Sequence, residues 1–234
     1  MGRRGADPED AALFAEDRVA TLRTATAELS WLLSRGYAEA SATELVGNRH
    51  ALRRRQRDAV RRSAAADDAL ADRAARRRDP HAIAGEPIAI DGFNCLITLE
   101  AALAGAPIFR GRDGAVRDIA SVHGNWRAVD TTERALACLA DALVRLNVGP
   151  TRGYLDRPVS RSAELARTID RLGAARSLQW QTEVVFDPDG ALAIGTELVA
   201  TADAGVLDRC GPWFDLVSHV LPFDVPDAWC LQLA

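Results

Sequence analysis

Short apolar segments alternate with segments of helical spacing after Pro87, and this alternation constrains the fold more than any other feature of the chain. Strands are expected at residues 87–91, 152–156, 182–187, 197–202 and 215–221. Helices are expected between them, at residues 94–105, 131–147, 160–173 and 203–210. Alternating strands and helices predict an α/β fold in which a doubly wound parallel sheet has helices on both faces, a three-layer α/β/α arrangement.

Residues 1–80 predict a different structure, a small all-helical domain that precedes the α/β domain of residues 85–234. Leucines at helical spacing predict one helix over residues 10–34, and a second helix is expected to run through residues 44–78. The segment 76–87 is rich in Pro, Gly and charged residues, which is typical of a linker.

The two parts of the chain also differ in charge. Residues 1–80 contain 16 arginines against 13 acidic residues, whereas residues 81–234 contain 13 arginines against 20 acidic residues. All 29 basic residues are arginine, which excludes Schiff-base chemistry and the lysine of a P-loop.

A basic segment at residues 49–62 contains seven arginines and is predicted to bind the backbone of RNA. The side chains expected to make these contacts are Arg53, Arg54, Arg57 and Arg61. A basic helix is equally compatible with a solvated face or with docking on the acidic part of the chain.

Neither the cysteines nor the histidines have the spacing of a metal site. The four cysteines and four histidines are scattered and no C-x-x-C pair occurs, so a structural zinc site is not expected. No apolar run in the chain approaches the ~20 residues of a membrane span. The N-terminus lacks the apolar core of a signal peptide. We therefore expect a cytoplasmic protein with no membrane partner.

Four of the expected strands end in an aspartate: "IAID" at Asp91, "GYLD" at Asp156, "VVFD" at Asp187 and "VATAD" at Asp203. All strands of a parallel sheet end at one edge, and ligands bind outside these ends near the point where the strand order reverses. With the first strand central and the second and fourth beside it, Asp91, Asp156 and Asp203 converge. Asp187 opens the turn signature "DPDG" on an outermost third strand and is expected to stay apart. Asp208 follows Asp203 by about one helical turn.

Such a cluster of carboxylates predicts a metal site, because crowded carboxylates repel one another unless a cation neutralises them. Oxygen ligands without His or Cys suit Mg²⁺ or Mn²⁺, and a metal held in this way activates water and stabilises a phosphoryl transition state. A single aspartate after a strand is more often a helix N-cap than a ligand. A metal site is therefore favoured because several acids, and not one, are expected at the same edge of the sheet.

Other phosphate and hydrolase chemistries do not fit the sequence. A haloacid-dehalogenase-like site requires a second aspartate where Phe93 stands, and neither a Walker sequence nor a G-x-S-x-G elbow is present.

Polar residues next to the acids are candidate substrate ligands. Asn94 is placed to hold a water molecule or a phosphate oxygen, or to cap the helix that it opens. Arg157 and Ser160 stand at the expected start of a helix, where an anion is favoured, although Ser160 is equally suited to be an N-cap. The segment 117–127, which contains His123, Asn125 and Trp126, is compatible with a substrate loop and with a buried structural turn.

The segments "IDGFNCLITLEAAL", "YLDRPVSRS" and "ATADAGVLDRC" together resemble the C-terminal domain family DUF5616, and "LSWLLSRGYAEASATELVGNRHALRRRQRDAVRR" resembles DUF434. The C-terminal part is also similar in layout to PIN and NYN nuclease domains. This resemblance implies a PIN-like fold and metal-dependent RNA cleavage at Asp91, Asp203 and Asp208. Glu133 or Asp156 would supply the remaining acid, and the sequence does not decide between them.

One departure from the pattern concerns the late motif, which reads "TAD" where many relatives have Ser in the middle. Ala202 removes that hydroxyl and weakens the expected support for substrate or metal.

The function predicted first is therefore a Mg²⁺- or Mn²⁺-dependent ribonuclease, with RNA as its partner. Two alternatives remain, a non-catalytic module that binds RNA or a ribonucleoprotein, and a phosphohydrolase acting on a small phosphoester. Each of these three functions is compatible with a homodimer.

Overall fold

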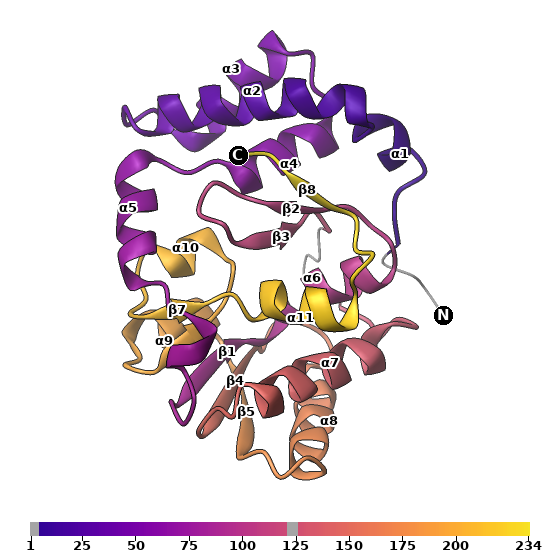
Figure 1. Cartoon of the computed structure of the whole chain (residues 1–234), viewed down its shortest axis with the longest axis vertical. Helices are drawn as coiled ribbons and strands as arrows, with labels where there is room; N and C mark the ends of the chain where they lie inside the picture. The colour runs from indigo at the N-terminus through magenta and orange to yellow at the C-terminus, as the bar shows by residue number, and fades with distance from the viewer. Residues whose placement is uncertain (1–4, 121–125) are drawn as a thin grey trace.

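The computed structural model describes residues 5–120 and 126–234, and its main sheet follows the alternation that the sequence predicts. The strands of this sheet are β1 (Ile88–Asp91), β4 (Thr151–Asp156), β5 (Trp180–Val185), β6 (Leu198–Ala200) and β7 (Trp213–Phe214). They are all parallel and lie in the order β5-β4-β1-β6-β7, of which β5, β4, β1 and β7 are labelled in Figure 1. The first strand is thus central, as predicted, and the arrangement is consistent with a PIN-like α/β fold.

Helices cover both faces of the main sheet, and β1 shows how the sequence divides between them. Ile88 and Ile90 point into one core, and Ala89 points into the other. The first core contains side chains of α6 (Gly92–Leu103), α7 (Thr132–Arg145), α8 (Ser162–Ala174) and α11 (Leu216–Asp224). The second core contains side chains of α9 (Pro188–Ile194) and α10 (Ala204–Leu207).

A second, smaller sheet was not predicted. It consists of β2 (Ile108–Arg110), β3 (Val116–Asp118) and β8 (Cys230–Gln232), in the order β3-β2-β8. Strands β2 and β3 are antiparallel, and β8 returns from the end of the chain to pair with β2 in parallel. Strands of three residues are too short to show a period of two, so the sequence pattern could not reveal them.

The expected strand at 215–221 is wrong, because this segment forms α11. Asp215 caps the helix by accepting a hydrogen bond from the Ser218 backbone N–H at 2.9 Å. The buried positions Leu216, Val217, Val220 and Leu221 recur at helical spacing.

The N-terminal region is all-helical, as predicted, but the long helix expected over residues 44–78 is wrong. The region contains α1 (Asp10–Leu13), α2 (Glu16–Leu33), α3 (Glu39–Arg49), α4 (Arg54–Ser63) and α5 (Asp67–Arg76), followed by the short 3₁₀ turn η1 (Pro80–Ala82).

One local and one tertiary hydrogen bond explain where the long helix breaks. Ala51 adopts a left-handed conformation after α3, and the Gln56 side chain then accepts from the Arg53 backbone N–H at 3.0 Å to start α4. Before α5, the hydroxyl of Ser34 on α2 accepts from the Asp67 backbone N–H at 2.9 Å. The bond between Arg53 and Gln56 is local, but Ser34 and Asp67 are 33 residues apart, which local propensity cannot anticipate.

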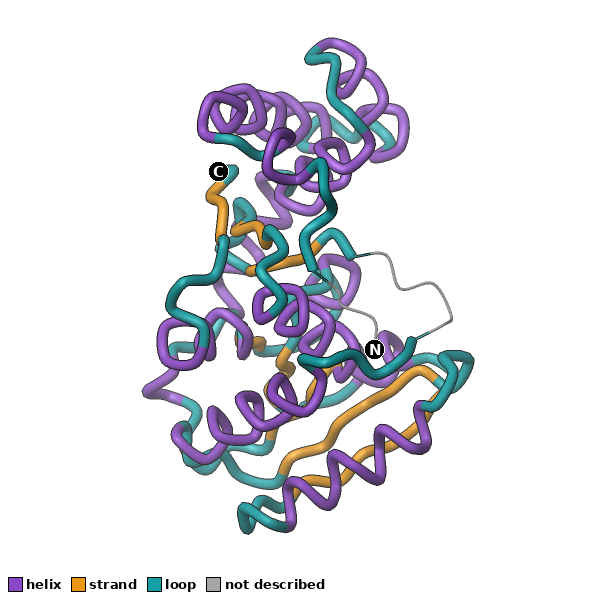
Figure 2. The backbone as a smooth tube through the Cα atoms, turned by 90° about the vertical axis from the view of Figure 1, so that its right-hand side faces the viewer, coloured by secondary structure: helices purple, strands orange, loops and turns teal. Residues whose placement is uncertain are grey.

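The N-terminal helices α1–α4 share a hydrophobic core with the small sheet. Phe14 packs edge-on against Phe109 of β2 with ring centroids 5.0 Å apart, and Leu233 after β8 belongs to the same core. Figures 1 and 2 show these helices together at one end of the long axis, with the main sheet toward the other end. Among the residues that the structure describes, no helix is long and apolar enough to span a membrane.

Candidate active site at the carboxyl edge of the main sheet

Asp91 is the last residue of the central strand and lies buried at the carboxyl edge of the sheet. The Thr201 hydroxyl donates to its Oδ2 at 2.8 Å, and the Asn94 backbone N–H donates to its Oδ1 at 3.4 Å. Gly92 allows the chain to turn at once into α6, because a Cβ there would lie 2.8 Å from the Tyr154 carbonyl oxygen and 2.6 Å from a Leu155 methyl group.

The register of the sheet explains how the other acids are placed around Asp91. On β4, Asp91 is level with Tyr154, so Asp156 lies two residues further along its strand. On the β6 side the register, continued by one residue, places Thr201 level with Asp91 and Asp203 two residues beyond it. With ~3.3 Å per residue, the register sets Asp91 back from Asp156 on one side and from Asp203 on the other, and we call this recess in the edge between Asp156 and Asp203 the crevice.

This stagger corrects the expectation of one tight carboxylate cluster. Within residues 5–120 and 126–234, no three His, Cys, Asp or Glu side chains lie close enough to hold a metal ion between them. The acids instead form a row along the edge and act on one another through their charges.

Among the residues that the structure describes, no cationic side chain pairs with Asp91. Burial, followed by the charges of Asp203 and Asp189, raises its pKa to about 7 in spite of the hydrogen bond from Thr201. Burial and the charge of Asp187 likewise raise the pKa of Asp156. A group that titrates near neutral pH in a crevice of acids is typical of a functional site.

Asp203 has a structural role as well as a place in the acidic row. Its Oδ1 accepts hydrogen bonds from the backbone N–H groups of Gly205 and Val206, at 2.8 and 3.2 Å, and caps α10. The Asn94 side chain does not point into open solvent, because its Oδ1 accepts from the Ala202 backbone N–H at 2.9 Å. Asn94 therefore ties the start of α6 to the loop that carries Asp203.

Asp208, predicted as a metal ligand, pairs with an arginine of the N-terminal region. Arg73 on α5 contacts Asp208 Oδ1 at 2.6 Å and Asp113 Oδ2 at 2.6 Å. Arg117 on β3 donates to both carboxylate oxygens of Asp113, at 2.9 and 2.6 Å, and from its Nε to the Ala202 carbonyl oxygen at 2.6 Å. This buried network fixes the loop of Asp203 to the rest of the fold.

A groove connects this loop with the basic helix α4. Its volume is about 500 Å³, and its charged lining includes Asp203 and Asp208 together with Arg61, Arg62, Arg73 and Arg117. Tyr37, which is 56% exposed, also borders the groove. We call this cavity the arginine–aspartate groove.

The predicted RNA-binding arginines of α4 have different surroundings. Arg53 and Arg54 are exposed, whereas Arg57 donates to the Leu52 carbonyl and to the Asn48 side chain at 2.9 and 2.8 Å. Their neighbour Arg55 forms a bidentate pair with a fully buried acid, Asp10, and thus serves the fold.

Arg61, the fourth arginine predicted to bind RNA, and Arg62, which was not predicted, line the groove that also contains Asp203 and Asp208. Arg61 also contacts Glu39 at 3.4 Å.

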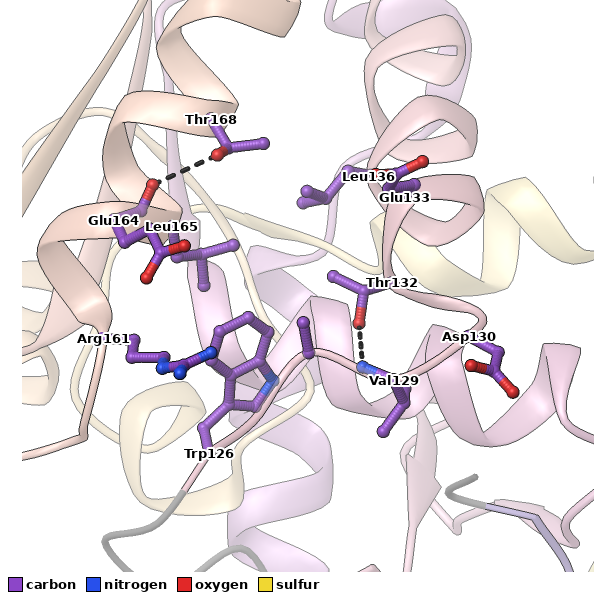
Figure 3. A pocket seen from close by; sticks show the side chains of 11 residues that line it. Trp126, Val129, Asp130, Thr132, Glu133, Leu136, Arg161, Glu164, Leu165 and Thr168 are labelled. Atoms are coloured by element: carbon purple, nitrogen blue, oxygen red, sulfur yellow. Dashed lines mark hydrogen bonds between the residues drawn. The ribbon is translucent and has the colours of Figure 1, made fainter. Parts of the chain in front are cut away.

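Glu133 lies in a separate cavity of about 470 Å³ between α7 and α8 (Figure 3). Figure 3 shows it on α7 beside Leu136, across the cavity from Arg161 and Glu164, and Asp91 does not line this cavity. Glu133 is exposed on the first turn of α7.

Trp126 is part of the buried structure, since it is 3% exposed and packs on Phe93 with ring centroids 5.8 Å apart. The hydroxyl of Ser160 donates to the Trp126 carbonyl oxygen at 3.0 Å, so this side chain is engaged in the fold. His123 and Asn125 lie outside the described residues.

Two models of known protein families match this chain. The model of a domain of unknown function, DUF5616, matches residues 80–219. The chain belongs to the DUF5616 family. A protein family of unknown function, DUF434, matches residues 21–76, so the DUF5616 region follows a DUF434 region as the resemblance predicts.

A relative of this DUF5616 protein is an uncharacterized protein of Methanocaldococcus jannaschii. It is 29% identical over 187 residues, which cover 80% of this chain and 89% of the relative. No solved structure matches the chain. The resemblance to PIN and NYN nucleases therefore stays a prediction.

Asp189 of the DUF5616 protein is an acid of the edge that the sequence did not single out. The turn expected at "DPDG" is wrong, because Asp187 caps α9 by accepting from the Gly190 backbone N–H at 2.9 Å. Burial and the charges of Asp203 and Asp156 raise the pKa of Asp189. An N-cap aspartate before Pro188 is a helix-start signal, and it would have placed Asp189 on a helix facing the crevice.

Proposed function

We propose that this protein is a metal-dependent ribonuclease whose reaction centre is the crevice of Asp91 and Asp203. The observation that carries the proposal is that Asp203 belongs both to the acidic edge of the sheet and to a groove lined by arginines. The charge of Asp203 acts on the buried carboxylate of Asp91, which has no cationic partner among the described residues, and Asp203 also lines a groove with two arginines of α4. A polyanion held by those arginines would reach the acids directly.

The donor set suits Mg²⁺ or Mn²⁺ in chemistry, although the side chains do not form a closed cage. Mg²⁺ commonly keeps several waters and is bound through one or two carboxylates together with substrate phosphate. Asp91 and Asp203 would supply those carboxylates, and Asp156 or Asp189 is near enough to add charge. When bound, the metal would lower the pKa of a water molecule and stabilise negative charge on the phosphate.

The protein's own residues then have separate tasks in this proposal. Asp91 holds negative charge at the floor of the crevice, and the Thr201 hydroxyl orients its carboxylate. Asn94 and Arg117 hold the backbone on either side of Ala202, so that Asp203 faces the groove in a fixed position. Arg61 and Arg62 bind the RNA backbone. We place this activity in the cytoplasm.

Divalent cation is expected to stabilise the folded protein through Asp91. At a Mn²⁺ concentration about ten times the dissociation constant, wild type should gain about 1.4 kcal/mol, or a Tm rise of roughly 3–6 °C. Asp91→Asn should lose most of this rise, because Asn cannot neutralise the cation. The measurement is thermal unfolding with and without Mn²⁺, each followed by EDTA.

The matched control is Asp141→Asn, which removes an acid paired with Arg176 on the surface. It should respond to Mn²⁺ like wild type. An equal response in Asp91→Asn would show that the ion binds elsewhere.

The arginines of the groove are expected to contribute directly to RNA affinity. Replacing Arg61 and Arg62 with Gln should weaken binding of single-stranded RNA and reduce the slope of log affinity against log salt by about 1 to 1.5. The control variant replaces Arg167 and Arg171 with Gln. These two arginines are exposed on α8, so the variant loses the same charge at a site outside the groove. Fluorescence anisotropy at several salt concentrations measures both pairs. Identical slopes for the two pairs would remove the groove from the proposal.

A non-catalytic RNA-binding module is the second candidate, and the surroundings of Asp208 favour it. Arg73 neutralises this acid, and the stagger of the strands keeps the acids from forming a closed site. RNA binding without cleavage by wild type in Mn²⁺ would support this alternative.

A further inference from the structure

Phe186 is an exposed aromatic side chain at the carboxyl end of strand β5. It is 73% exposed, the highest value for an aromatic residue in the described part of the chain. It directly follows β5, and Arg157 directly follows the adjacent strand β4. The Arg157 guanidinium carbon lies 4.8 Å from the centroid of the Phe186 ring. The Arg157 backbone N–H donates to the Val185 carbonyl at 2.7 Å, which holds the two strand ends together.

This pair contributes little to the fold. A ring with about three-quarters of its surface in water buries little apolar area, and an exposed cation–π contact stabilises a protein only weakly. Its neighbours are the acids of the edge, since Arg157 follows Asp156 and Phe186 precedes Asp187. An exposed aromatic ring with a cation beside it has the two chemical properties that nucleotides bind, a stacking face and a positive charge.

We propose that Phe186, with Arg157 beside it, stacks an unpaired nucleobase of the RNA and forms a substrate-binding site at the β5 end of the acidic edge. This inference rests on the proposed function and specifies its substrate as single-stranded. A base inside a duplex is already paired and stacked, whereas an unpaired base is free to stack on an aromatic side chain. Arg157 then faces the phosphate next to that base, where it offsets the repulsion of Asp156 and Asp187.

The strand order makes this site complementary to the arginine–aspartate groove. The groove meets the edge at Asp203 after β6, and Phe186 stands after β5. Strands β4 and β1 lie between them, so the two ends are three strand spacings apart, or ~14 Å. An RNA strand held at both ends would cross the crevice above Asp91.

The chain contains a matched control for Phe186. Phe223 on α11 is 63% exposed and also has an arginine over its ring, with Arg145 at 5.0 Å. Arg145 is in the last turn of α7, and the chain enters β4 at Thr151 six residues later, so Arg145 is on the side of the sheet where the strands begin. Phe223 therefore has the same local chemistry at the opposite edge.

The test measures binding of a single-stranded oligonucleotide in EDTA, so that no metal-dependent cleavage interferes. The oligonucleotide contains one 2-aminopurine, whose fluorescence is quenched on stacking, at successive positions. Wild type should quench it at one position. Phe186→Ala should remove that quenching and weaken binding on the order of 10-fold. Phe186→Trp should retain both properties, and Phe223→Ala should match wild type. An abasic site at the quenched position should make wild type and Phe186→Ala bind equally.

The outcomes separate this inference from the proposed function. If wild type binds the oligonucleotide and Phe186→Ala binds and quenches equally well, the stacking site is overturned while the ribonuclease proposal stands. Equal weakening in Phe223→Ala would also overturn it, since the effect would then come from general surface change. Absence of RNA binding by wild type would overturn both.

Discussion

Asp113→Ala is expected to destabilise the protein by about 3–5 kcal/mol, because it would leave two buried arginines without their shared counter-ion. Arg73 contacts Asp113 Oδ2 at 2.6 Å, and Arg117 donates to both carboxylate oxygens at 2.9 and 2.6 Å. Both guanidinium groups are nearly inaccessible to water, with side chains 4% and 3% exposed. Arg73 would keep Asp208, but Arg117 would keep only backbone carbonyl partners.

The acid dependence of stability should follow the same network. Burial alone would raise the pKa of Asp113, but the hydrogen bond and charge of Arg117, together with the charge of Arg73, lower it to about 2. Because this folded-state pKa lies below the unfolded value of 3.8, the contribution is complete above about pH 4. It is lost as the pH falls from about 4 toward 2.

Denaturant unfolding followed by circular dichroism tests this expectation. Asp141→Ala is the control, since it breaks a pair with Arg176 whose acid is about half exposed, and it should cost less than about 1 kcal/mol. A similar loss of unfolding free energy in both variants would contradict the conclusion that the Asp113 network stabilises the fold more than an exposed ion pair does.

The central part of the fold was predictable because β1, β4, β5 and β6 are apolar segments that each end at or shortly before an aspartate, whereas the edge strand β7 was not predicted. The order around β1 followed from the parallel arrangement, and "IAID" and "VATAD" marked the two acids of the crevice. The stagger of those acids was not predictable, since it depends on the level of Asp91 against Tyr154, which no local pattern encodes.

The pairing of Asp208 with Arg73 could not be predicted from the sequence for a related reason. The two residues are 135 positions apart, and they meet only because α5 runs beside α10. Asp189 is a different case, because Asp187 and Pro188 did carry a helix-start signal that the turn signature outweighed. The small sheet was missed because its strands have three residues each.

Asp91→Asn is expected to stabilise the metal-free protein above neutral pH. The folded-state pKa of Asp91 is raised from 3.8 to about 7, chiefly by burial. An acid whose pKa is raised on folding makes the protein less stable as the pH rises from about 4 to about 7, by up to about 4 kcal/mol for a shift of this size. Asn at this position carries no charge and removes that loss.

Thermal unfolding of the two proteins from pH 4 to pH 8, in EDTA, measures the effect. The Tm of Asp91→Asn should approach or fall below that of wild type at pH 4 and exceed it at pH 8. A constant difference across this range would mean that Asp91 does not titrate within it.

The same variant should lose catalysis. Asn keeps the size of Asp and one carbonyl oxygen, but it cannot balance the charge of a divalent cation, so cleavage of RNA should fall at least about 100-fold. Arg157, Phe186 and the groove are unchanged in this variant, and RNA binding in EDTA should therefore persist.

The most direct test of the ribonuclease proposal is cleavage of a labelled single-stranded RNA by wild type and by Asp91→Asn, each with Mn²⁺ and with EDTA. We expect products from wild type in Mn²⁺ and from none of the other three reactions. Cleavage that survives both EDTA and Asp91→Asn would contradict a metal-dependent centre at Asp91. RNA that wild type binds but leaves intact in Mn²⁺ would contradict catalysis and identify the crevice as part of a binding module.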